Sequence, residues 1–190
     1  DAVAIFDISY SNFSGGESGV NVENSEFYSI LWGDGNIDVD PRFRDSENGN
    51  YNLFASSLCI NAGDPTAQDE DGTRRDMGAY PYLVDHDGSD DWYVSTSGSD
   101  STGMGSSISK FASIQAALNF AYENQTIHVA SGTYNENIEW PIYTSGIKLL
   151  GAGIDSSIID GGGNGRVINI NGFNPPDVPV NDQLVGSDTE

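Results

Sequence analysis

Residues 113–138 read Ser-Ile-Gln-Ala-Ala-Leu-Asn-Phe-Ala-Tyr-Glu-Asn-Gln-Thr-Ile-His-Val-Ala-Ser-Gly-Thr-Tyr-Asn-Glu-Asn-Ile, and they join an amphipathic helix to a short strand. Ser113 stands where a helix N-cap is expected. Four apolar residues are spaced so that they lie on one face of a helix: Ile114, Ala117, Leu118 and Ala121. The pattern predicts a helix over about residues 113–123, followed by a strand at residues 126–129.

Short apolar runs separated by turn residues surround this helix. They recur about every 8 to 12 residues, which is typical of an all-β sandwich or a parallel β-solenoid. The short strands, the Asn and Gly residues at the turns and the position of the helix favour the solenoid, because a helix can cover the unpaired backbone of a first coil. The strands expected in this half are 92–95, 126–129, 138–140, 146–150, 157–160 and 166–170.

The first part of the chain has similar short runs but no helical pattern. The strands expected there are 3–10, 19–22, 36–40, 51–54 and 58–63. Residues 85–91, Asp-His-Asp-Gly-Ser-Asp-Asp, contain no apolar residue and indicate a boundary. We therefore divide the chain into residues 1–83, an acidic linker at 84–91, and residues 92–190.

Composition and charge exclude several classes of protein. The 190 residues carry 29 Asp and Glu against 7 Lys and Arg, a formal net charge of −22, which repels nucleic acid and anionic membrane surfaces. No apolar run approaches the roughly 18 residues needed to span a bilayer. A lone cysteine, Cys59, cannot form an internal disulfide, and two histidines are too few for a Cys/His zinc site. Cys59 is expected in the core, because it lies between Leu58 and Ile60.

Two stretches of the chain resemble opposite ends of one fold. Residues 92–138, from Trp92-Tyr93-Val94-Ser95 to Gly132-Thr133-Tyr134, resemble the N-terminal cap and first coils of right-handed parallel β-helix proteins, the pectin-lyase-like superfamily. Residues 147–152 and 158–161 match the next coils. Residues 35–43, 58–65 and 71–80 are similar to the C-terminal end of such proteins, of the type found in secreted bacterial surface proteins. The resemblance implies an all-β fold of right-handed parallel β-helix segments, with the helix at about 113–123 as a cap.

The order of these two ends is unusual, since the end of one β-helix precedes the start of another. Three accounts remain open. The chain can be a window from a longer protein with tandem β-helices, a self-contained subunit that stacks its open ends on other copies, or a circularly permuted solenoid. The third account needs the linker at 84–91 to be stretched along the whole stack. Other copies or further coils of the same protein are therefore the expected partners.

Catalytic signatures of the superfamily are sparse in this sequence. The resemblance implies that enzymes of this kind cleave acidic polysaccharides with a Lys or Arg base or with paired carboxylates. The lysines are Lys110, before the helix, and Lys148, in a coil. Asp38 and Asp40 alternate on one side of an expected strand but are two among many carboxylates. These residues favour a protein without catalytic activity, with a polysaccharide lyase or hydrolase fragment as the alternative.

The densest cluster of oxygen ligands lies in residues 64–76. Asp69, Asp71 and Asp76 are the expected ligands of a calcium ion, because Gly72 allows a sharp turn around a hard cation. The alternative is a charged capping loop neutralised by Arg74 and Arg75. Calcium is the one cofactor that the sequence suggests.

Aromatic residues near turns are the remaining signal for carbohydrate. A ring face can stack on a sugar ring. The candidates for sugar stacking are Trp32, Tyr134, Trp140 and Tyr143, and packing of loops on the solenoid is the alternative for all of them. His128 alternates with Ile127 and Val129 and is expected to face outward.

Together these observations predict a non-catalytic, extracellular or cell-surface β-helix module with a structural or adhesive role. It can assemble head to tail into a filament or belong to a longer tandem β-helix protein. A polysaccharide-active enzyme fragment and a carbohydrate-binding module are the alternatives.

Overall fold

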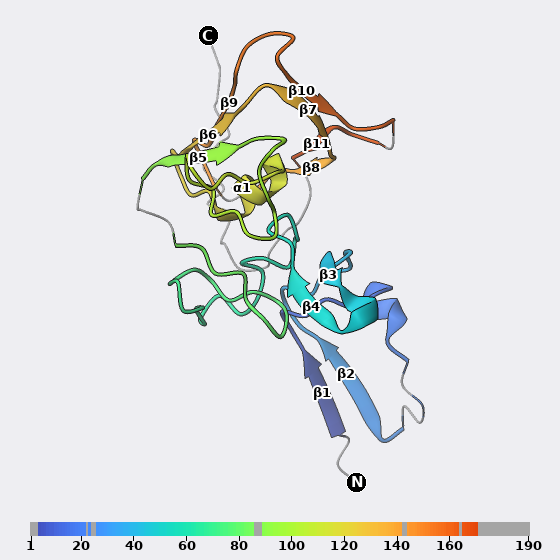
Figure 1. The fold of residues 1–190 in the computed structure, drawn as a ribbon. Helices are drawn as coiled ribbons and strands as arrows, with labels where there is room; N and C mark the ends of the chain where they lie inside the picture. Colours follow the sequence, from blue (N-terminus) through green and yellow to red (C-terminus); the bar gives the residue numbers. More distant parts are fainter. Residues whose placement is uncertain are drawn as a thin grey trace, which may run out of the picture.

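The structure, a computed structural model, describes residues 4–21, 23, 26–85, 89–141, 144–163 and 165–170. Short strands and one α-helix make up the regular structure of this part of the chain, so the all-β prediction is confirmed (Figure 1). The elements of the first half are β1 (Ala4–Ile8), the 3-10 helix η1 (Gly16–Gly19), β2 (Tyr28–Trp32), β3 (Phe43–Asp45), the 3-10 helix η2 (Ser46–Asn48) and β4 (Asn50–Leu53). Those of the second half are β5 (Asp91–Val94), α1 (Ile114–Phe120), β6 (Thr126–Val129), β7 (Gly132–Asn135), β8 (Ile138–Glu139), β9 (Lys148–Gly151), β10 (Ser157–Asp160) and β11 (Ile168–Asn169).

The strands of the second half form three short parallel sheets. Their orders are β5-β6-β9, β7-β10 and β8-β11. The chain therefore passes through the three sheets once as β6, β7 and β8 and a second time as β9, β10 and β11. Ile127 pairs with Leu149, Tyr134 with Ile159, and Ile138 with Ile168, so apolar residues of successive passes meet in register.

Helix α1 is capped at both ends by local and distant contacts. The Ser113 hydroxyl accepts the Ala116 N–H, which confirms the predicted N-cap. The helix ends at Phe120 rather than near 123, because Ala121 has an extended backbone and Tyr122 donates its N–H to the Gln125 side chain. The predicted apolar face is buried and contacts β5, β6 and β8.

The first half contains one parallel ribbon and one antiparallel pair. β1 pairs with β2 in parallel, and β3 pairs with β4 in antiparallel. An isolated bridge joins Asn12 to Ile37 next to the ribbon. The strands expected at 19–22 and 58–63 are absent from the described residues, and that at 36–40 is reduced to this bridge. Side chains compete for the backbone there, since Asn12 donates to the Val39 carbonyl and accepts the Val39 N–H.

One apolar core runs through both halves of the chain. It includes Leu53 and Cys59 from the first half and Trp92 and Phe120 from the second. The Cys59 side chain is buried, as predicted, and its burial raises the pKa of the thiol. Tyr82 contacts the ring of Phe120, with ring centroids 5.9 Å apart.

Polar contacts of Asn119, on α1, join the two halves. Its side-chain amide donates to the carbonyls of Ala55 and Ser57, and its own carbonyl accepts from the Asn61 side chain. The Tyr82 hydroxyl donates to the Gly103 carbonyl at 2.7 Å. The described parts of residues 1–83 and 92–170 are therefore packed against each other, while residues 86–88 of the predicted linker lie outside the described residues. Among the described residues no helix has the length and apolar character that crossing a bilayer requires.

Candidate functional site on the β5-β6-β9 sheet

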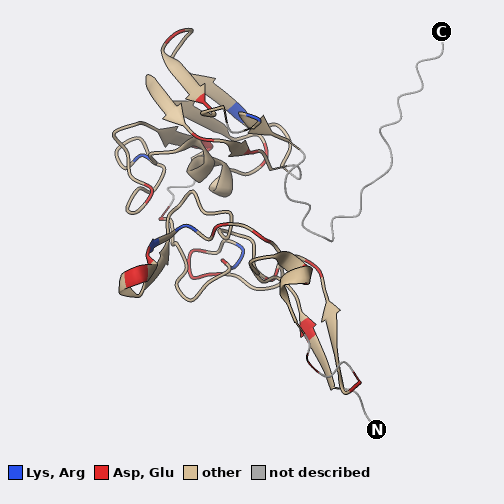
Figure 2. Ribbon diagram, turned by 90° about the vertical axis from the view of Figure 1, so that its right-hand side faces the viewer, with Lys and Arg blue, Asp and Glu red and all other residues tan. Residues whose placement is uncertain are grey.

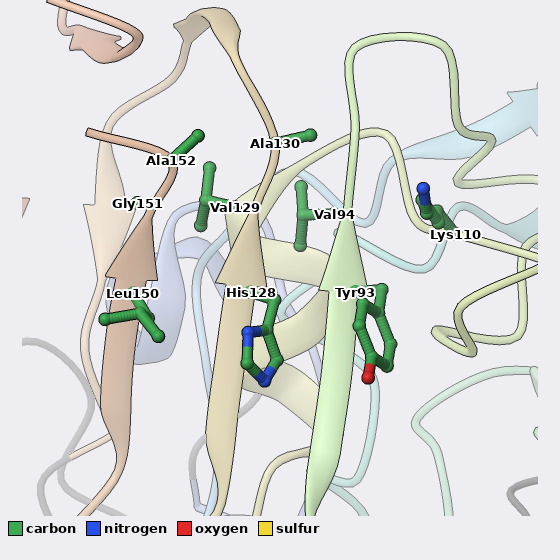
Figure 3. Close-up of a pocket in the computed structure, with 9 residues that line it drawn as sticks. All are labelled: Tyr93, Val94, Lys110, His128, Val129, Ala130, Leu150, Gly151 and Ala152. Atoms are coloured by element: carbon green, nitrogen blue, oxygen red, sulfur yellow. The ribbon is translucent and has the colours of Figure 1, made fainter.

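A row of side chains crosses the outer face of the β5-β6-β9 sheet. Because side chains alternate along a strand, the neighbouring residues Trp92 and Ile127 point inward and are buried. The register places Tyr93 beside His128 and His128 beside Leu150. Figure 3 shows these three side chains on adjacent strands, with Lys110 beyond Tyr93.

Lys110 joins this row through a bridge at the edge of the sheet. Phe111 pairs in parallel with Val94, and its N–H donates to the Tyr93 carbonyl. This pairing brings Lys110 to the level of Tyr93. We call Lys110, Tyr93, His128 and Leu150 the outer row.

His128 has two partners within the sheet. Its ring stacks on Tyr93, with centroids 5.0 Å apart and an interplanar angle of 15°. Its Nε2 lies 2.7 Å from Asp91 Oδ1, so a carboxylate fixes the ring orientation. The prediction that His128 faces outward is confirmed, because Ile127 and Val129 are buried whereas His128 is only partly buried. Its partners were not predicted.

The outer row borders a hollow of about 240 Å³. The lining residues are Tyr93, Val94, Lys110, His128, Val129, Ala130, Leu150, Gly151 and Ala152. They supply an amine, an imidazole, a phenol and apolar surface but no carboxylate. A pair of carboxylates of the kind used in glycoside hydrolysis is therefore missing from this lining.

The oxygens of the acidic loop are occupied by backbone N–H groups. Asp69 Oδ2 accepts the N–H of Asp76 at 2.8 Å. Asp71 accepts the N–H of Thr73 with one oxygen and that of Val84 with the other. The three expected calcium ligands are thus close to one another along the loop but face different parts of the backbone.

Asp76 is the buried member of this group. Its two oxygens accept the N–H groups of Asn61 and Tyr82 at 2.7 and 2.8 Å. Burial raises the pKa of Asp76 to about 6, although the two hydrogen bonds act in the opposite direction. Within the described residues no three His, Cys, Asp or Glu side chains gather closely enough to hold a metal ion, so the carboxylates do not form a ready calcium cage. The calcium site stays a prediction.

The arginines of the loop bind mainly to the backbone. Arg74 Nε donates to the Gly63 carbonyl at 2.6 Å. Arg75 Nε lies 3.9 Å from Asp69 Oδ1, and its side chain is 60% exposed. At this distance, and with the arginine largely exposed, the pair contributes little stability, so arginine neutralisation of the loop is weak.

The aromatic candidates for sugar stacking lie in different settings. Tyr134 lies in β7 rather than in a turn, and its ring is 3% exposed, with its hydroxyl donating to the Ala130 carbonyl. In this structure its ring offers no face to a sugar. Trp140 is partly buried against the core, and Trp32 meets Phe13 edge-on at 5.6 Å. Tyr143 lies outside the described residues. The structure does not bring Trp32, Tyr134 and Trp140 into one site.

The other candidate catalytic groups are also dispersed. Lys148 is exposed on β9, in the row beside the outer row. Asp38 accepts the N–H of the distant Gly15, and Asp40 accepts that of Arg42 two residues later, so each carboxylate binds a backbone N–H group. None of the three lines the hollow beside the outer row.

A comparison with known proteins gives one partial likeness. The chain is 37% identical over 101 residues to the protein described as "Probable pectinesterase/pectinesterase inhibitor 12" from Arabidopsis thaliana. The aligned stretch covers 46% of this chain and 18% of that protein. No family model matches the sequence, and no solved structure matches it.

Proposed function

We propose that this chain is a non-catalytic structural module of an extracellular protein, built from segments of right-handed parallel β-helix. The observation that carries the proposal is the repeated passage through three parallel sheets, β6-β7-β8 and then β9-β10-β11. Two such passes in register are what two coils of a solenoid would give, and they support the proposal. Right-handedness follows from the general rule for crossovers between parallel strands.

The open edges of these sheets support a structural role. β9, β10 and β11 are each the last strand of their sheets in the described residues, and no further strand of the described part of the chain pairs with β9 or β10 on the outer side. Further coils, from the same or another chain, would pair with them. The part of a pectinesterase-related protein that resembles this chain is small, so the resemblance favours a shared scaffold over a shared activity.

Polysaccharide turnover tests the proposal directly. The purified chain is incubated with pectate, alginate, chondroitin and methyl-esterified pectin. We expect neither the ultraviolet absorbance of an unsaturated product nor the release of methanol. Formation of either product by the unmodified chain and by Arg75→Ala, but not by Lys110→Ala, would contradict the structural module and indicate an enzyme.

A second candidate function is contact with an acidic polysaccharide along the outer row. It is favoured by Lys110 and His128, which lie on one face with an apolar neighbour, Leu150. Affinity electrophoresis in gels that contain polygalacturonate measures this contact. We expect retardation to fall in Lys110→Ala and His128→Ala but not in Arg75→Ala, whose side chain is exposed in the other half.

A further inference from the structure

The ribbon formed by β1 and β2 stands out from the body of the molecule (Figure 1). Its apolar side chains are exposed on both faces, with Ile5 67%, Phe6 54% and Leu31 55% accessible. Parallel sheets are normally covered on both faces, and an isolated pair of strands is marginally stable in water. The ribbon therefore has the character of a sheet that lacks a neighbouring strand.

A hollow of about 500 Å³ lies along one face of the ribbon. Phe6 and Ile8 on β1, Tyr28 and Ile30 on β2, and Val20 supply its apolar lining, and Asp7, Asn21 and Glu23 also line it. Ile5 and Asp7 alternate with Phe6 and Ile8, so their side chains point to the opposite face. Alternation along β1 thus places the side chains of Phe6 and Ile8 on one face and those of Ile5 and Asp7 on the other.

At the opposite end of the described residues, side chains of β9 alternate in the same way, and no further described strand pairs with its outer edge. On β9, Leu149 continues the inward row of Trp92 and Ile127, whereas Lys148 points outward and is exposed. Leu149 and Ile159 are only partly buried, because the described residues supply no coil beyond them. β9 and β1 are both strands of parallel sheets, so β1 can follow β9 without a change of direction.

The charges at the two ends differ, since the ribbon end is acidic and the last pass carries as many basic as acidic side chains. The acidic residues in the described part of 4–32 are Asp7, Glu17, Glu23 and Glu26, and this stretch of the sequence contains no Lys, Arg or His. The last pass, residues 147–170, carries Lys148 and Arg166 against Asp155 and Asp160. Figure 2 shows acidic colour without basic colour on the ribbon and basic colour among the strands at the other end.

We infer that β1 of one copy pairs in parallel with β9 of a second copy, with Asp7 beside Lys148. This inference rests on the proposed solenoid and names its partner as a second copy of the chain. Inward-facing Leu149 then meets Ile8, and Ile147 meets Phe6. The contact joins two different surfaces and does not close on itself, so it builds a head-to-tail filament.

The hydrogen bonds of β1 show which groups the contact uses. The Ala4 N–H donates to the Phe27 carbonyl, and the Ile8 carbonyl accepts the Gly33 N–H, so residues 4, 6 and 8 face β2. By the alternation of a parallel ladder, the N–H groups of Ile5 and Asp7 face the free edge. Proline at position 5 removes an edge donor and leaves the bonds to β2 in place.

Sedimentation velocity over a range of concentrations tests the contact. At physiological ionic strength we expect the unmodified chain to form species larger than a monomer that grow with concentration. Asp7→Lys and Lys148→Asp should each weaken association by about fivefold, since each turns an attractive pair into a repulsive one. The double variant restores the attraction and should associate as the unmodified chain does. Ile5→Pro should abolish association, and Ile5→Val, which keeps the N–H, should not.

Three results would overturn the inference. A monodisperse monomer at every concentration would do so, as would assembly that Ile5→Pro leaves unchanged. Single charge reversals that weaken assembly without rescue in the double variant would overturn the pairing of Asp7 with Lys148. Near-ultraviolet circular dichroism of every variant confirms that its core is folded. None of these results depends on polysaccharide turnover. The non-catalytic module is tested by the turnover experiment alone, so the two proposals can fail separately.

Discussion

Glu136 Oε1 accepts the backbone N–H of Ile114 at 2.8 Å and thereby fixes the start of α1 to the turn between β7 and β8. Its second oxygen accepts the next N–H, that of Gln115, at 3.0 Å. The first N–H groups of a helix have no partner within the helix, so a carboxylate from the sheet completes this end. The start of α1 and the turn between β7 and β8 are therefore one hydrogen-bonded unit.

Removal of this carboxylate should destabilise the chain. Glu136→Ala leaves two largely buried N–H groups without their acceptor, at a cost of about 1–3 kcal/mol. We expect a lower melting temperature by circular dichroism. Glu123→Ala, at an exposed position after the same helix, serves as the control and should change stability by less than about 0.5 kcal/mol. Equal melting temperatures for the two variants would contradict this role of Glu136.

Asn119 should control whether the two halves unfold together. In Asn119→Ala the carbonyls of Ala55 and Ser57 lose their donor, and the contact between α1 and residues 55–61 weakens. Differential scanning calorimetry should show one transition for the unmodified chain and a broader or split transition for the variant. The exposed Asn135→Ala is the matched control. A sharp single transition in Asn119→Ala would show that the shared apolar core alone couples the halves.

Asp76 should make stability fall as pH rises from about 4 to about 6. Burial raises its pKa from 3.8 to about 6 in the folded chain, so the folded state holds the proton over an interval in which the unfolded state releases it. The stabilisation is complete below the unfolded pKa and is lost as pH passes the folded pKa. A shift of about two pKa units corresponds to roughly 3 kcal/mol.

Chemical denaturation at several pH values measures this contribution. The difference in unfolding free energy between the unmodified chain and Asp76→Asn should change by up to that amount over the interval, since Asn does not titrate. A difference that stays constant would assign the pH dependence to other carboxylates.

Chelation tests the predicted calcium site at Asp69, Asp71 and Asp76. A cation that binds only the folded chain stabilises it by mass action, by about 2.7 kcal/mol at a concentration 100 times its dissociation constant. We expect excess chelator to lower the melting temperature of calcium-loaded protein and to have no effect on Asp71→Asn. An unchanged melting temperature would leave the backbone N–H groups as the sole partners of these carboxylates.

The elements that could be predicted from the sequence are those whose own residues favour one structure. The strands at 126–129 and 157–160 have the bounds expected from their β-branched residues, and Ser113 caps α1 as its position predicts. β7 was missed because Gly132, Thr133 and Asn135 form a weak strand pattern, and its strand conformation depends on pairing with β10.

The candidate site was harder to predict for a related reason. Lys110, Tyr93 and His128 come from three segments, and only the register of the sheet brings them into one row. The signal available in the sequence was the alternation around His128, which gave its direction but not its neighbours. The same holds for Glu136, because no local pattern connects a residue in a turn with the start of a helix that precedes it.

The junction at Asn119 is made by α1, whereas β9, β10 and β11 are the last strands of their sheets in the described part of the chain. If the proposed solenoid is correct, whole circuits of the chain can be gained or lost after these strands while the contact between α1 and the first half remains intact. The number of circuits and the contact between α1 and the first half are then separate properties, and natural selection can act on each of them independently. Variation among relatives should accordingly appear as insertions or deletions of complete circuits after β11, with the residues around Asn119 unchanged.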